Sequence, residues 1–135
     1  MKISAEYLAG LFDGEGYVGV INHRTQGSYY TLRATITNTE KISLQIIQSQ
    51  FGGSLLVHEH HDEIHRDRWV LVWYGEKAKD LFRIMLPHSI LKANQMRLAL
   101  TFPIGKPAGR GIKVDKEKQN EIYVGLQKQK TWSRV

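Results

Sequence analysis

The chain has 135 residues, which is enough for one domain with a sound core and too few for two. Its 19 lysines and arginines outnumber 13 acidic residues and give a net charge of +6, which favours an anionic partner such as nucleic acid. The absence of cysteine excludes a disulfide framework and a thiolate metal site. No apolar run reaches membrane-spanning length, and the N-terminus lacks the apolar core of a signal peptide. We therefore expect a soluble intracellular protein of the cytoplasm, the nucleoid or an organelle, with no membrane partner.

The first predicted helix begins after Ser4, which can cap it, and runs to about Asp13. It contains Gly10 and Gly14, and a glycine inside a helix costs about 0.5–1 kcal/mol relative to alanine. The two glycines are four residues apart and share a face, on which a second backbone could approach closely. The helix ends in two carboxylates, Asp13 and Glu15, which the helix macrodipole disfavours at that end. A bound cation would remove this conflict.

Alternating apolar and polar residues predict two β-hairpins, one formed by residues 17–22 and 29–37 and the other by residues 54–60 and 66–74. One face of the strands is apolar and is assigned to the core. The other carries polar and basic groups, which a sheet lying in a DNA major groove would need. The residues expected to contact DNA are Arg33, Thr35, Thr37, His58, His60, Arg66 and Arg68. An ordinary solvated face remains the alternative interpretation.

Helical periodicity predicts three further helices before residue 103. The first follows a capping box at residues 37–40 and stops at a glycine pair, and the second covers residues 76–86. The third carries Ile90, Leu91, Leu98 and Phe102, and we assign all these apolar stripes to the core.

Residues 103–114 are rich in proline and glycine and form a predicted basic linker before a last helix at about 115–130. Three basic residues of the linker, Lys106, Arg110 and Lys113, are expected to lie along a phosphate backbone.

The string LAGLFDGEG at residues 8–16 resembles the signature of the LAGLIDADG homing endonucleases. The order of predicted elements is also the αββαββα core of that family, so the resemblance covers about residues 5–102 of a single domain, 1–135. It implies an α/β (α+β) fold, in which a saddle-like sheet of four antiparallel strands is followed by extra C-terminal helices. It also implies a site-specific double-strand DNA endonuclease that hydrolyses phosphodiester bonds with Mg²⁺. An RNA-binding intron maturase without cleavage activity remains the alternative.

The resemblance assigns roles to individual residues. Glu15 stands where the family has its essential acidic residue, which implies a metal ligand, with the carbonyl of Gly14 as a second donor. Lys92 stands where the family has an active-site lysine. Asn38 matches a position that often holds a polar residue that orients water, although a helix N-cap would explain Asn38 equally well.

Only one copy of the signature is present, so two chains are needed to pair the signature helices. The resemblance therefore implies a homodimer, with Tyr7, Gly10, Leu11 and Gly14 at the interface. Its expected target is double-stranded DNA with a long, roughly palindromic sequence. A DNA-binding regulator would need an added recognition domain, for which the residues after Phe102 are too few.

Overall fold

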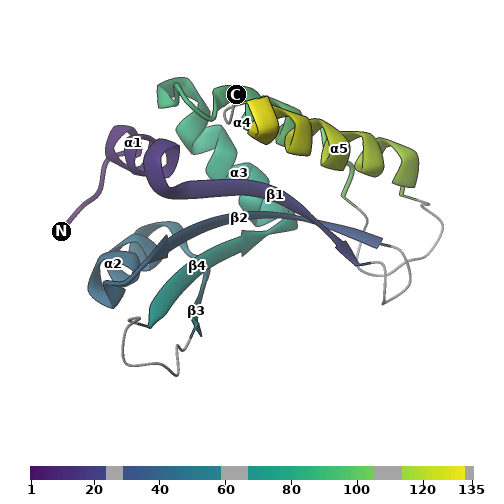
Figure 1. Cartoon of the computed structure of the whole chain (residues 1–135). Coiled ribbons are helices and arrows are strands. Elements are labelled where there is room, and N and C mark those ends of the chain that lie inside the picture. The colour runs from purple at the N-terminus through teal and green to yellow at the C-terminus, as the bar shows by residue number, and fades with distance from the viewer. Residues whose placement is uncertain (24–28, 59–66, 105–113, 133–135) are drawn as a thin grey trace.

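The computed structural model describes residues 1–23, 29–58, 67–104 and 114–132. Their helices and strands follow one another in the order α1 (Ala5–Glu15), β1 (Gly16–His23), β2 (Tyr29–Asn38), α2 (Lys41–Phe51), β3 (Ser54–His58), β4 (Arg68–Tyr74), α3 (Gly75–Met85), the 3₁₀ helix η2 (Leu86–His88), α4 (Ala93–Leu100) and α5 (Lys116–Trp132). The predicted αββαββα order with additional C-terminal helices is confirmed (Figure 1). None of the described helices is long and apolar enough to cross a membrane.

The four strands form one antiparallel sheet in the order β1-β2-β4-β3, which leaves β1 and β3 at its edges. In the register of the sheet, Val18 lies opposite Ala34, which in turn lies opposite Trp73, and all three are buried. The predicted alternation is therefore correct. The opposite face, which we call the open face, carries the alternate residues of each strand.

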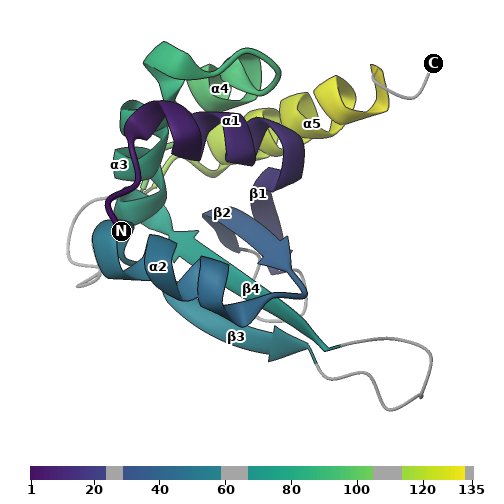
Figure 2. The same ribbon diagram turned by 90° about the vertical axis from the view of Figure 1, so that its left-hand side faces the viewer.

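One hydrophobic cluster joins the core face of the sheet to the helices. It contains Leu8 of α1, Leu44 of α2, Phe82 of α3 and Met96 of α4, each at most 1% exposed. The last helix belongs to the same cluster, because its Ile122 and Leu126 are buried there. Figure 2 shows α1 and α2 in front of the sheet, with α5 running behind α1. Packing in this cluster therefore fixes the position of the C-terminal end of α1 relative to the sheet.

The first helix begins as predicted and continues two residues further than predicted. The hydroxyl oxygen of Ser4 accepts the backbone N–H of Tyr7 at 3.1 Å, which confirms the N-cap. Glu15 is the last helical residue and Gly16 starts β1. A Cβ at residue 16 would lie 2.6 Å from the carbonyl oxygen of Phe12, so only glycine allows the strand to leave the helix this tightly.

Two local predictions are wrong. The capping box before α2 does not form, because the N-cap of α2 is Glu40 and no side chain caps it. Instead, the side-chain oxygen of Asn38 accepts the backbone N–H of Glu40 at 3.0 Å, which forms a turn before the helix. Ile90 and Leu91 are neither helical nor buried, since they are 84% and 73% exposed and precede α4. Their backbone amides are instead used by Asp13, as described next.

Candidate active site

The carboxylate of Asp13 holds the loop at residues 89–92 against the end of α1. It accepts the backbone N–H groups of Ile90 at 2.7 Å, Leu91 at 3.1 Å and Lys92 at 3.2 Å, together with the hydroxyl of Ser89. Burial raises the pKa of Asp13, but these hydrogen bonds outweigh it, and the net pKa lies below the ordinary value. Asp13 is therefore an ionised clamp between two segments about 75 residues apart in sequence.

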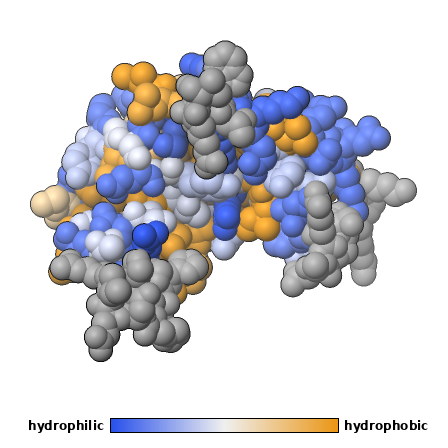
Figure 3. Space-filling model, viewed as in Figure 1, coloured by the Kyte–Doolittle hydropathy of each residue, from blue (hydrophilic) through white to orange (hydrophobic). Residues whose placement is uncertain are grey.

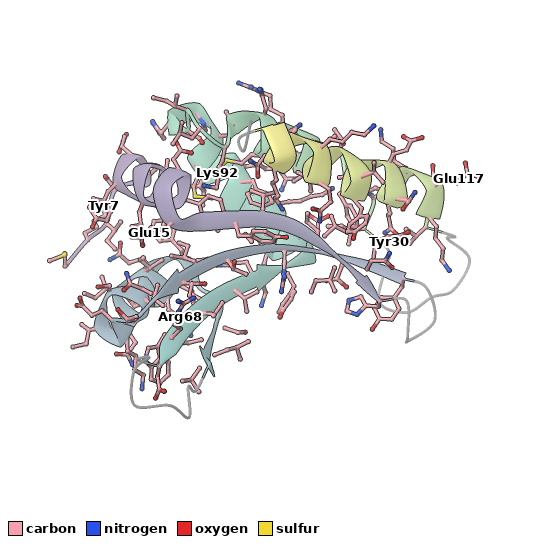
Figure 4. The ribbon with its side chains drawn as sticks, in the orientation of Figure 1. Tyr7, Glu15, Tyr30, Arg68, Lys92 and Glu117 are labelled. Carbon is pink, nitrogen blue, oxygen red and sulfur yellow. The ribbon has the colours of Figure 1, made fainter. Side chains whose placement is uncertain are left out.

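The clamp fixes Lys92 at the end of α1. Lys92 is the last residue of the clamped loop, and its Nζ donates to the carbonyl oxygen of Asp13 at 2.6 Å, two residues before Glu15. Burial lowers the pKa of Lys92, the charge of Asp13 opposes this, and the positive charge of Lys130 adds to the lowering, so the net pKa is depressed. Figure 4 shows Glu15 and Lys92 near the same end of α1. This brings together two of the three residues predicted to be catalytic.

The third residue predicted to be catalytic, Asn38, lines a hollow of about 340 Å³. Its lining consists of Glu15, Thr37, Asn38, Thr39 and Arg68. The exposed Glu15 therefore shares a cavity with Asn38 and with two residues that we predicted to contact DNA. Because Oδ1 of Asn38 is engaged by the Glu40 amide, Asn38 can offer its Nδ2 hydrogens to a bound group. The turn-forming role and a role in the site are thus compatible.

The oxygen donors at the end of α1 suit a hard cation such as Mg²⁺. Glu15 supplies the carboxylate, and Gly14 lies in the last turn of α1, whose carbonyls find no partner within a helix. Among the described residues, no group of three or more histidine, cysteine or acidic side chains could hold a metal by itself. Glu15 and the Gly14 carbonyl are thus two candidate oxygen ligands, and a cation bound there would need further ligands.

The residues predicted to contact DNA fall into three groups. Arg33, Thr35, Thr37 and Arg68 lie on the open face, where the β2–β4 register aligns Thr35 with Val72 and Thr37 with Val70. Thr35 is only 9% exposed, whereas Arg33, Thr37 and Arg68 are more accessible. His58 ends β3 opposite Arg68. The remaining predicted contacts are His60, Arg66, Lys106, Arg110 and Lys113, which lie outside the described residues.

The side of α1 that faces away from the core carries the residues predicted for the dimer interface. Tyr7 is 63% exposed, Gly10 and Gly14 are exposed, and Leu11 is half-buried. A Cβ added at Gly10 or Gly14 would meet no atom of the described chain within 4 Å. Within the described residues, no packing contact requires glycine at these two positions, and a helical glycine is less stable than alanine.

Sequence reasoning missed two parts of the site. The clamp formed by Asp13 and Ser89 joins two segments that are far apart in the sequence, so no spacing rule predicts their contact. The only local signal for it was an acidic residue beside the signature glycines. No role was predicted for Lys130 at the end of the last helix, yet its Nζ lies 3.6 Å from the centre of the Tyr17 ring. That contact spans more than 100 residues and leaves no local pattern in the sequence.

Known proteins resemble both the sequence and the fold. A model of the family described as "LAGLIDADG-like domain" matches residues 2–85, which is well over half of the chain. The matched residues include α1 with its acidic end and all four strands of the sheet. The chain belongs to the LAGLIDADG-like domain family.

Individual relatives agree with this assignment. The "Probable intron-encoded endonuclease aI2" of Debaryomyces hansenii is 40% identical over 50 residues, which make up 37% of this chain and 7% of that protein. The archaeal intron-encoded homing endonuclease I-Vdi141I, solved in complex with DNA, has a TM-score of 0.70 at 17% identity, over 93% of this chain and 82% of the other. The homing endonuclease I-CvuI, solved with its target in the presence of 2 mM Ca, has a TM-score of 0.61 at 18% identity, over 91% and 94%. Another structure of I-CvuI contains DNA in the presence of 2 mM Mg. At these identities the structural likenesses show the fold.

Proposed function

We propose that this chain is a site-specific DNA endonuclease that acts as a homodimer and hydrolyses phosphodiester bonds with a divalent metal, Mg²⁺. The observation that supports this most strongly is the Asp13 clamp. It ties Lys92 to the end of α1, two residues from Glu15, and Glu15 lines a hollow together with Thr37 and Arg68 of the open face. The DNA-bound structures of I-Vdi141I and I-CvuI support the same assignment through the shared fold.

Each residue of the site has a separate task. The Glu15 carboxylate and the Gly14 carbonyl would hold the metal, which when bound polarises the phosphate and makes water a better nucleophile. The ammonium group of Lys92 stabilises the negative charge that develops on the phosphate oxygens. Asn38 donates from Nδ2 to water or phosphate at the wall of the hollow, and Arg68 and Thr37 bind the flanking backbone.

The dimer completes what one chain lacks. Packing of the α1 glycines across a two-fold axis would bring two Glu15 carboxylates together. Two carboxylates at close range repel each other unless nearby cations neutralise them. Formation of the dimer would therefore be linked to metal binding. Two chains of charge +6 give 2 × (+6) = +12, which attracts a DNA duplex.

The test is cleavage of a plasmid library with randomised inserts in the presence of Mg²⁺, comparing the native chain with Glu15→Gln. We expect the variant to bind the selected site and to lose cleavage by more than about 100-fold, because even groups that only support a metal ligand are worth about 10–100-fold.

The matched control is Glu117→Gln, which makes the same chemical change at an exposed position at the far end of the molecule (Figure 4). It should cut at the native rate. Native cleavage by Glu15→Gln would rule out the metal role of Glu15. A native chain that cuts no duplex and binds intron RNA would favour the maturase alternative instead.

A further inference from the structure

Tyr17, the second residue of β1, places an aromatic ring on the open face of the sheet. It lies opposite Thr35 in the register, on the face away from the core. A Cβ at Gly19 would collide with the ring of Tyr17, so the ring lies directly over Gly19. Because β1 is an edge strand, this ring is at the free border of the sheet and two residues from Glu15.

Two cations approach this ring from different elements. The Nζ of Lys130 is 3.6 Å from the ring centre, and the guanidinium carbon of Arg33 is 5.5 Å from it. Arg33 reaches the ring from the neighbouring strand, since it pairs with Gly19. Its Nε is buried and has no hydrogen-bond partner within the part of the chain that the structure describes. A buried donor of this kind is costly unless a bound group accepts from it.

The packing of α5 explains how Lys130 reaches the open face. Ile122 and Leu126 anchor α5 in the core, and Lys130 follows one helical turn after Leu126 on the same side. Near the end of the helix its long side chain reaches the ring of Tyr17 on the edge strand β1, where its Nζ is buried. The rest of the surface over α5 is largely hydrophilic (Figure 3).

Lys130 also lies close to the proposed active site. Its charge is one cause of the depressed pKa of Lys92. The pKa of Lys130 itself is lowered by burial, raised by Tyr17 and lowered again by Arg33. Lys130 and Arg33 thus lie close enough to repel each other, and a bound anion would offset this repulsion.

We propose that Lys130, Arg33 and the Tyr17 ring form a binding site for a backbone phosphate of DNA, on the β1 side of Glu15. The ring holds the ammonium group in place, and the guanidinium group supplies the unsatisfied Nε donor. This inference rests on the proposed function, because it takes DNA as the source of the phosphate. It makes the C-terminal helix part of the DNA-binding surface, in addition to the sheet.

The test measures binding of a fluorescent duplex of fixed sequence, about 30 base pairs long, at a series of salt concentrations. Each phosphate contact contributes a slope of about −0.9 to log K against log salt. We expect Lys130→Gln to reduce the slope by about one for each bound chain. The matched control is Lys118→Gln, an exposed lysine of the same helix about 18 Å further along its axis, which should leave the slope unchanged.

The possible outcomes separate the two proposals. A steep native slope that Lys130→Gln leaves unchanged overturns the phosphate site while the proposed function stands. A nearly flat native slope overturns both. Lys130→Arg guards against a folding defect, because it keeps the charge and the helix: restoration of the native slope supports the phosphate site, and a reduced slope despite native thermal stability contradicts it.

Discussion

At the scale of single residues, Asp13 connects the stability of the chain to the geometry of its site. Its carboxylate accepts from three successive backbone amides and from Ser89, and so satisfies the donors of the loop before α4. The same loop carries Lys92, whose Nζ returns to the carbonyl oxygen of Asp13. Under the proposed function, a change at Asp13 should therefore affect folding and cleavage together, even if Asp13 is not itself a metal ligand.

We predict that Asp13→Asn destabilises the chain by about 1.5–3 kcal/mol at neutral pH, the usual worth of hydrogen bonds to a charged group. Because the folded pKa of Asp13 is depressed, its ionised form stabilises the fold at every pH above the unfolded value near 4. That contribution is lost as the pH falls through the folded pKa. Urea unfolding from pH 7 downward should thus show the native chain and the variant converging below about pH 4.

The matched control for this experiment is Asp80→Asn. Asp80 is an exposed acid, 69% accessible at its side chain, and it makes a local ion pair with Arg83 at 2.8 Å. Such surface pairs contribute at most about 1 kcal/mol, so this variant should stay close to the native chain at all pH values. A difference between native and Asp13→Asn that persists unchanged in acid would contradict the ionised clamp.

At the scale of elements, periodicity could be read from the sequence and long-range contacts could not. The strands alternate clearly because one face of the sheet is buried, so Val18, Ala34 and Trp73 were assigned to the correct side. Ile90 and Leu91 were misassigned because an apolar pair before a helix looks like the start of an apolar stripe. What decides their structure is the Asp13 carboxylate, about 77 residues away.

The glycines of α1 were also singled out from sequence, and they give a prediction at this scale. We predict that Gly10→Leu leaves the fold of each chain intact, because the position is open in the described structure. The added side chain should prevent close approach of a second α1 and weaken self-association by at least about tenfold, which is worth about 1.4 kcal/mol. Sedimentation equilibrium of the two proteins measures this directly.

The control is Gln45→Leu, which places the same side chain at an exposed position of α2. Gln45 does not line the hollow that lies between α1 and α2. It should associate like the native chain. If Gly10→Leu dimerises with native affinity, the helix-to-helix interface is incorrect, and the α1 glycines need another explanation.

At the scale of the whole molecule, the two-fold symmetry of the proposed dimer determines the symmetry of the DNA sequence that it would bind. Each chain has one open face and one Glu15, so under the proposed function a single chain would contact and cut only half of a site. An isologous pair repeats the same contacts on both sides of a two-fold axis. DNA-binding dimers of this kind bind inverted repeats, because each half-site must present the same groups to identical surfaces.

We therefore predict that duplexes selected by the native chain from a fully randomised library are inverted repeats. Sequencing the selected pool measures this, and the two halves should match when one is read as the reverse complement of the other. Gly10→Leu provides the internal comparison: lacking its partner, it should enrich only one half-site and bind more weakly, since the second half no longer adds contacts through a linked chain. A native consensus that is asymmetric would exclude the symmetric dimer even if the chain cuts DNA, because two identical open faces cannot prefer two different half-sites.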